Sequence, residues 1–268
     1  MLATALIVFR EVFEAALIVG IVLAATRGVA SRNTWIAIGI AGGVIGAGLV
    51  AAFASTIADA AQGFGQELFN AAVLFIAVAM LAWHQVWMNR HGREIAAQMT
   101  TMGKAVSEGG QPLYVLAIVV GVAILREGSE AVLFLYGVAA GATDSHAQLL
   151  FGGVGGLAAG VACGAALYFG LLTIPSRVLF SVTGWMIILL AAGMASQGAG
   201  FLVQAGILPA LGEQIWNSSA ILERSSIFGQ VLHSLVGYDD RPAGIQLLFY
   251  GATLLSIVFF TRVLARQR

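Results

Sequence analysis

Seven long apolar stretches restrict this chain to one class of fold. A helix needs about 20 residues to cross roughly 30 Å of hydrocarbon. Stretches of that length occur at 3–26, 35–58, 68–89, 113–140, 147–173, 178–204 and 244–264. All four prolines fall at or outside these boundaries, where they break no hydrogen bond inside a helix. The sequence therefore predicts an all-α, polytopic membrane protein with seven transmembrane helices.

The charges between these stretches predict the orientation. The loops after the first, third and fifth stretches and the C-terminal tail hold nine basic residues, whereas the other side holds only Arg224 and Arg241. Because basic loops stay in the cytoplasm, we expect the N-terminus outside and the C-terminus inside, in the cell inner (plasma) membrane. Three outer acids, Glu67, Asp239 and Asp240, are then a candidate outer mouth that attracts cations. Acids also gather where basic residues are excluded, and a helix N-terminus favours them.

A charged segment with the pattern R-E-x-x-E-A occurs twice, beginning at Arg10 and at Arg126. Each lies in an apolar stretch that is followed by a glycine-rich one. The glycines are Gly39, Gly42, Gly43 and Gly46 in the first case, and Gly152, Gly156, Gly160 and Gly164 in the second. Small residues at such spacing let helix backbones approach closely. The pattern indicates two related units of three spans each.

The duplication predicts how the single transmembrane domain, 1–268, is organised. Three spans are an odd number, so the second unit, 111–204, must enter the membrane from the side opposite to the first, 1–110. This is a 3+3 inverted repeat with one added span, 244–268. The segment 205–243 between them mixes apolar and polar residues. It is predicted to form one or two amphipathic helices on the outer interface, or a surface that docks a partner.

Each motif gathers three charges on one side of a helix near the middle of its span. Residues three and four apart share a helix face, and each charge at mid-membrane costs roughly 2.5–3.5 kcal/mol. If the first and fourth spans touch, four carboxylates and two guanidinium groups meet. Ion pairs within each helix would still leave a charge of about −2, which a cation or protons must balance. The residues are Arg10, Glu11, Glu14, Arg126, Glu127 and Glu130.

The chemistry of the donor atoms restricts which cations the site can bind. Clustered carboxylates are hard oxygen donors that suit Fe(III), Mn, Ca or Mg. Neither motif contains Cys, and His84, the only His in a predicted span, is interpreted as an interfacial or bundle-facing residue in preference to a ligand. The residues alone leave open a permease for Mn, Pb or another divalent metal, and a proton-coupled carrier of organic cations.

Other classes of protein fit the sequence poorly. It has no phosphate-binding G-x-x-x-x-G-K-[ST] loop, and its one cysteine, Cys163, excludes an internal disulfide and a multi-cysteine metal cluster. Ser129 lies in the second motif, but no His in a span has an evident route to it. We therefore expect a protein that is not an enzyme, has no tightly bound cofactor and does not bind nucleic acid.

Two R-E-x-x-E motifs in the first and fourth of seven spans resemble the oxidase-dependent iron permeases, also called the iron/lead transporter family. That family includes the eukaryotic high-affinity ferric permease and the bacterial Efe-type ferric permease. The similarity covers most of the chain. "GQELFNAAVLFIAVAMLAWHQVWM" resembles the family's third span, and "SSIFGQVLHSLVGYDDRPAGIQLLFY" resembles its last outer loop and seventh span.

The resemblance implies high-affinity import of Fe(III) by a permease whose ligands are four glutamates supported by Arg10 and Arg126. It also implies an extracytoplasmic ferroxidase or iron-delivery protein that hands over Fe(III). Some eukaryotic members carry another paired-acid motif in an outer loop. This chain lacks a close copy of that motif, because the residue three positions after Glu67 is Asn70 and not a second acid. The implied ligands are Glu11, Glu14, Glu127 and Glu130.

Overall fold

The computed structural model describes residues 1–60, 65–141, 145–170, 176–224 and 226–266. These residues form helices and connecting loops, without strands, which confirms the all-α prediction. The helices are α1 (Leu2–Ala25), α2 (Arg32–Ala60), α3 (Gln66–Ser107), α4 (Tyr114–Gly141), α5 (His146–Tyr168), α6 (Ser176–Gln204), α7 (Ile227–Val236) and α8 (Gly244–Arg266).

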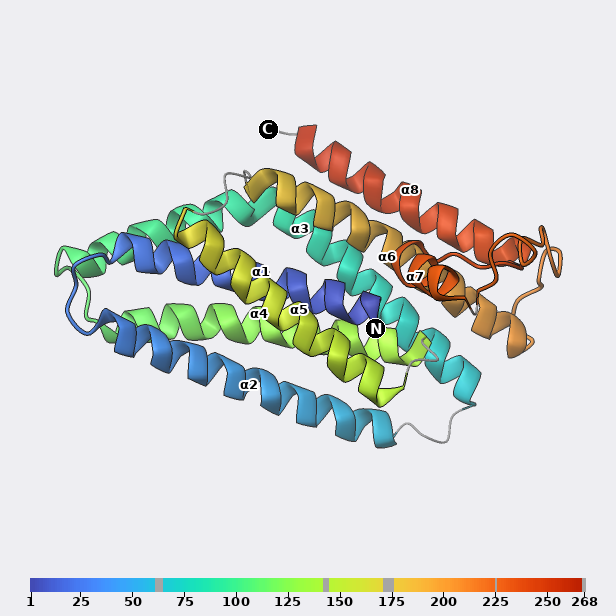
Figure 1. The fold of residues 1–268 in the computed structure, drawn as a ribbon, viewed down its shortest axis with the longest axis horizontal. Coiled ribbons are helices and arrows are strands. Elements are labelled where there is room, and N and C mark those ends of the chain that lie inside the picture. The colour runs from blue at the N-terminus through green and yellow to red at the C-terminus, as the bar shows by residue number, and fades with distance from the viewer. Residues whose placement is uncertain (61–64, 142–144, 171–175, 225, 267–268) are drawn as a thin grey trace.

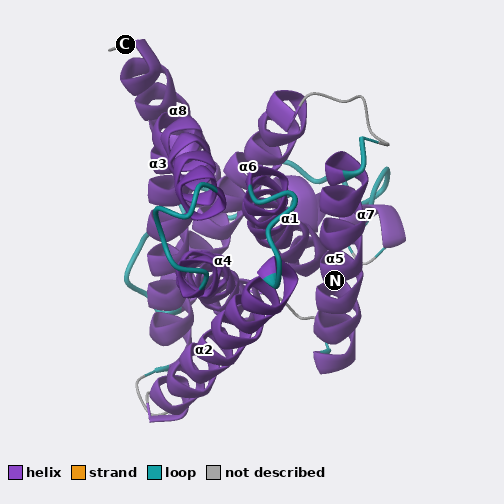
Figure 2. Cartoon of the chain, turned by 90° about the vertical axis from the view of Figure 1, so that its left-hand side faces the viewer, coloured by secondary structure: helices purple, strands orange, loops and turns teal. Residues whose placement is uncertain are grey.

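Five helices in the described part of the chain, α2, α3, α5, α6 and α8, are long and apolar enough to cross a membrane. This agrees with a polytopic membrane protein. The helices that carry the motifs, α1 and α4, are of similar length, 24 and 28 residues, but each has three charged residues in its middle. They run antiparallel and in contact (Figure 1). Viewed along the bundle, α1 lies near its middle (Figure 2), where it contacts α3, α4, α5 and α6.

The two glycine-rich helices pack on the motif helices of the opposite unit. A Cβ added to Gly156 of α5 would overlap the carbonyl oxygen of Ala5 in α1, and one at Gly39 of α2 would lie 2.6 Å from the carbonyl oxygen of Ala117 in α4. The close approach predicted from the small residues is thus present, because α5 covers α1 and α2 covers α4. Gly42 is the exception, since it faces open space.

The third helix is longer than the stretch 68–89 predicted for it. It runs unbroken for 42 residues to Ser107, or about 63 Å at 1.5 Å per residue, which is about twice the hydrocarbon thickness. Its last turns pack beside the end of α1, where Gly103 lies against Ala25 and Val106 is buried with Val22. Hydropathy marks only the part of the helix at membrane depth, so it missed the polar extension.

The described residues of the segment 205–243 form one helix, α7, where one or two were predicted. The Ser226 hydroxyl accepts a hydrogen bond of 3.0 Å from the backbone N–H of Gly229 at its start. Gly237 ends it with a left-handed φ of 69° and lies against Gly193 of α6, so a side chain at either glycine would force the two elements apart. The remaining described residues of the segment form turns and irregular loops.

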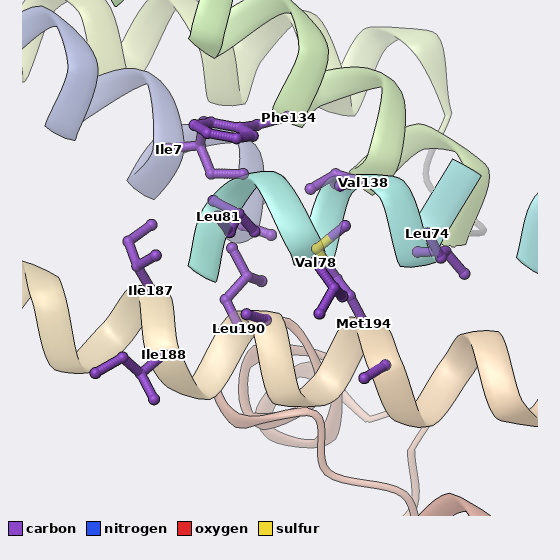
Figure 3. Packing of buried hydrophobic residues seen from close by; sticks show 14 of the residues in the cluster. Ile7, Leu74, Val78, Leu81, Phe134, Val138, Ile187, Ile188, Leu190 and Met194 are labelled. Carbon is purple, nitrogen blue, oxygen red and sulfur yellow. The ribbon is translucent and has the colours of Figure 1, made fainter. Parts of the chain in front are cut away.

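Two apolar clusters enclose the middle of the bundle. The first joins α3 and α6 with Ile7 and Phe134 (Figure 3). The second lies toward the opposite end of α1 and consists of Val22, Ile36, Val106, Leu116 and Val120. Along α1, α3 and α4, the charged residues of the motifs and His84 come between members of the two clusters. The fold therefore holds a polar layer between two apolar ones.

Candidate metal site

Side chains from three helices converge in this polar layer. Glu11 of α1, His84 of α3, and Glu127 and Glu130 of α4 each offer one ligand atom, and the four atoms lie within 4.8 Å of one another. We call these four residues the central cluster. Glu11 is only 1% exposed, and Glu127 and His84 are also buried. One cation can contact four atoms at such spacing, because metal–oxygen and metal–nitrogen bonds are about 2.0–2.6 Å long.

The arginines pair mainly with the second glutamate of each motif. Arg10 Nε lies 3.0 Å from Glu14 Oε1, one helical turn away, and Arg126 Nε lies 3.0 Å from Glu130 Oε1. The first glutamates lie farther from the arginines: Arg10 Nη1 is 3.4 Å from Glu11 Oε1 and Arg126 Nε is 3.9 Å from Glu127 Oε1. The hydrogen bonds differ between the motifs, because Arg10 donates to Glu11 whereas Arg126 donates to Glu130.

Both motifs contain carboxylate oxygens that are left for another partner. Glu11 Oε2, Glu127 Oε2 and both oxygens of Glu14 are buried and accept no hydrogen bond within the part of the chain that the structure describes. A buried carboxylate oxygen without a partner is costly. With four carboxylates and two guanidinium groups, the layer carries a formal charge of −2 when all are ionised. Both features favour a bound cation.

His84 joins the two motifs. Its Nδ1 contacts Glu130 Oε2, and its Nε2 lies 3.8 Å from Glu14 Oε2. The sequence interpretation left His84 as an interfacial or bundle-facing residue, in preference to a ligand, and assigned the metal site to glutamates alone. The structure buries His84 in the bundle and brings one of its ring nitrogens among the ligand atoms of the central cluster. His84 and Trp87 are one turn apart and therefore share a helix face. In the structure this face lies against the second motif, where Trp87 contacts Arg126 and His84 contacts Glu130. Glu14 contacts His84 from outside the central cluster.

The second motif lies beside a groove that the first motif does not reach. The side chain of Arg126 is 35% exposed, whereas Arg10 is buried. The groove has a volume of about 640 Å³ between α3 and α4. Its lining is apolar except for His84, Arg126 and Glu130. The guanidinium carbon of Arg126 lies 4.0 Å from the centre of the Trp87 ring. The lining residues are Ile76, Ala79, Met80, Trp83, His84, Trp87, Arg126, Glu130 and Phe134.

We expect Trp87→Leu to lower metal uptake about tenfold. The indole face holds Arg126 by a cation–π contact, worth between about 0.5–1 kcal/mol at an exposed site and about 2 kcal/mol where water is excluded, and Arg126 in turn holds Glu130. Uptake of radioactive metal into cells, normalised to protein in the membrane, measures the effect. Trp83→Leu is the matched control, because Trp83 lines the same groove but is 73% exposed. Equal uptake by both variants would show that Trp87 does not position the motif.

The three acids of the candidate outer mouth lie outside the central cluster. Glu67 is exposed in the first turn of α3. Asp239 Oδ2 lies 3.4 Å from Arg224 Nη1, and Asp240 Oδ2 accepts a hydrogen bond of 3.4 Å from the Arg224 backbone N–H. His233 Nε2, on α7, lies 3.1 Å from Arg224 Nη2. These aspartates therefore hold the segment around α7 together.

Comparison with known proteins identifies relatives along nearly the whole chain. The model of the iron permease FTR1 family matches residues 1–266. The ferrous iron permease EfeU of Escherichia coli O6:H1 (strain CFT073) is 32% identical over 243 residues, which cover 89% of this chain and 87% of that protein. EfeU of Escherichia coli O157:H7 is 31% identical over 242 residues with the same coverage. EfeU of Shigella flexneri is 32% identical over 179 residues, 66% of this chain and 75% of that protein. No solved structure matches this chain.

Proposed function

This chain belongs to the iron permease FTR1 family, and from that premise we propose that it carries iron into the cell through the central cluster. The observation that carries the proposal is the convergence of four ligand atoms within 4.8 Å from α1, α3 and α4. These residues come from helices far apart in the chain. Carboxylate oxygens and an imidazole nitrogen are all ligands that iron accepts. The site fits a transported ion, and the relatives are permeases, not enzymes.

We further propose that seven helices, α1–α6 and α8, span the cytoplasmic membrane with the N-terminus outside. The five apolar helices support this arrangement, and so does the position of α1 and α4 against them. The reciprocal packing of α5 on α1 and α2 on α4 supports an inverted repeat of residues 1–110 and 111–204. The excess of basic residues in one set of loops supports the orientation.

The charge of the site favours Fe(II) as the ion bound there. A formal charge of −2 is balanced by one divalent ion, whereas Fe(III) would leave an excess positive charge in a buried layer. The Escherichia coli relatives are named as ferrous permeases. Fe(III), with delivery by an extracytoplasmic ferroxidase, is the second candidate, supported by the hard oxygen donors of three glutamates. An organic cation fits less well, because the ligand atoms lie too close together to enclose one.

Transport then requires the two apolar clusters to open in turn. The first cluster, with Ile7, Leu81 and Phe134, separates the site from the end where α1 begins, and the second separates it from the end where α1 finishes. The membrane potential supplies about 4.6 kcal/mol per 100 mV for a divalent ion, twice the value for one charge. That energy drives entry without ATP. An occluded site between two gates is consistent with alternating access.

Purified protein in liposomes tests the proposal. We expect an inside-negative potential to drive saturable uptake of radioactive iron kept as Fe(II) by ascorbate, and lower uptake of Fe(III) citrate. Liposomes without protein are the control. Uptake of Fe(III) alone would replace the Fe(II) assignment by the second candidate. Uptake no faster than in empty liposomes, under both conditions, would contradict iron transport by this chain.

A further inference from the structure

We infer that His84 is a nitrogen ligand of the transported ion and that it makes the site prefer Fe(II) to Mn(II) and to Fe(III). This inference rests on the proposed function. It concerns the one member of the central cluster that lies outside both R-E-x-x-E motifs. The role follows from the position of the ring, the chemistry of imidazole and the charge of the layer.

The position of His84 gives its ring access to both motifs. Nδ1 contacts Glu130 of the second motif and Nε2 lies 3.8 Å from Glu14 of the first, so each nitrogen faces a carboxylate. Phe134 packs edge-on against the ring at a centroid distance of 6.1 Å. Both nitrogens are buried. One ring nitrogen lies within 4.8 Å of a carboxylate oxygen from each of Glu11, Glu127 and Glu130, so a single cation can contact all four.

Imidazole changes the selectivity of a carboxylate site. Three carboxylates alone suit Mg, Ca and Mn as well as iron. An imidazole donor favours transition metals such as Fe(II), which bind such sites more tightly than Mn(II) does. A neutral imidazole also adds no charge. The layer therefore stays at −2, which matches a divalent ion, while a carboxylate in the same place would bring it to −3 and match Fe(III).

Only one of the two related units supplies this donor. The counterpart of α3 in the second unit is α6, and residues 176–204 contain no Asp, Glu, His or Cys. The motifs contribute one glutamate from the first unit and two from the second. His84 adds a second donor from the first unit and gives the site a mixed set of oxygen and nitrogen donors.

Metal binding to the purified full-length protein tests this role. Titration calorimetry with Fe(II) under anaerobic conditions, and separately with Mn(II), gives the ratio of the two dissociation constants. We expect His84→Gln to weaken Fe(II) binding at least about tenfold and to change Mn(II) binding much less, so that the preference for Fe(II) falls. We expect His84→Glu to raise the uptake of Fe(III) relative to Fe(II) in liposomes. Glu108→Gln is the control, since Glu108 is exposed at the end of the same helix and lies outside the central cluster.

The outcomes separate this inference from the proposed function. Suppose that the wild-type protein binds and transports iron, but His84→Gln leaves the ratio of the Fe(II) and Mn(II) dissociation constants unchanged, including by weakening the binding of both metals equally. His84 then only supports the glutamates, and the inference is wrong. If the wild-type protein neither binds nor transports iron, the proposed function itself fails. If His84→Gln does not fold, His84→Asn and the liposome assay with His84→Glu provide the same comparison.

Discussion

Replacing Glu127 by Gln is expected to reduce iron uptake by at least about a hundredfold and to leave the protein folded. Mutating a residue that only hydrogen-bonds to a metal ligand commonly costs 10–100-fold in metal affinity or activity. Removing a ligand itself should cost no less. Glu127 is buried, its Oε2 accepts no hydrogen bond from the described residues, and its other oxygen is 3.9 Å from Arg126. The amide has the same shape but removes one negative charge and one strong donor for the ion.

The fold should tolerate this change, because neutralising one of several neighbouring carboxylates relieves repulsion within a buried layer. Uptake of radioactive iron, together with the thermal midpoint of the purified protein, measures the two effects separately. Glu108→Gln is the matched control, since Glu108 is exposed at the end of α3. Uptake by Glu127→Gln at the wild-type rate, from a normal amount of protein in the membrane, would exclude Glu127 as a ligand.

Replacing Gly156 by Leu is expected to disrupt both folding and transport. A Cβ at this position would overlap the carbonyl oxygen of Ala5, and it would lie 2.9 Å from the backbone N of Phe9. Backbone atoms cannot move aside as a side chain can, so α5 must separate from α1. Overpacking of this kind costs about 1–3 kcal/mol. A displacement of α1 on the order of 1 Å also misplaces Glu11, which can cost about a hundredfold in rate.

The yield of monodisperse protein, its thermal midpoint and iron uptake together test this prediction. We expect all three to fall for Gly156→Leu. Gly155→Leu is the matched control, because Gly155 is the preceding residue of the same helix and a Cβ there meets no atom within 4 Å. If the two variants behave alike, the close packing of α5 on α1 does not position the site.

The sequence predicted the parts of this fold that local patterns determine. Hydropathy located the helices, and glycines every fourth residue in α5 predicted a close helix contact, although only the structure shows that α1 is the neighbour. The motif spacing put Glu11, Glu127 and Glu130 near one another once the two helices were assumed to touch. These features follow from helix periodicity and from the cost of charge in lipid.

Other features depend on contacts between distant segments, which no local pattern records. His84 was interpreted as an interfacial or bundle-facing residue, and its closeness to both motifs arises only when α3 packs on α1 and α4. Glu14 resembled the other motif glutamates, yet it pairs with Arg10 and lies outside the central cluster. The unequal exposure of Arg10 and Arg126 also cannot be read from the pattern R-E-x-x-E-A that the two motifs share.

The most direct test is a structure of the protein with bound iron, recorded with anomalous scattering at the iron absorption edge. The central claim is that oppositely directed helices hold one metal ion among buried oxygen and nitrogen donors. It predicts a single strong peak within bonding distance of Glu11, His84, Glu127 and Glu130. A peak at another place, or a well-ordered central cluster without one at saturating iron, would contradict the claim.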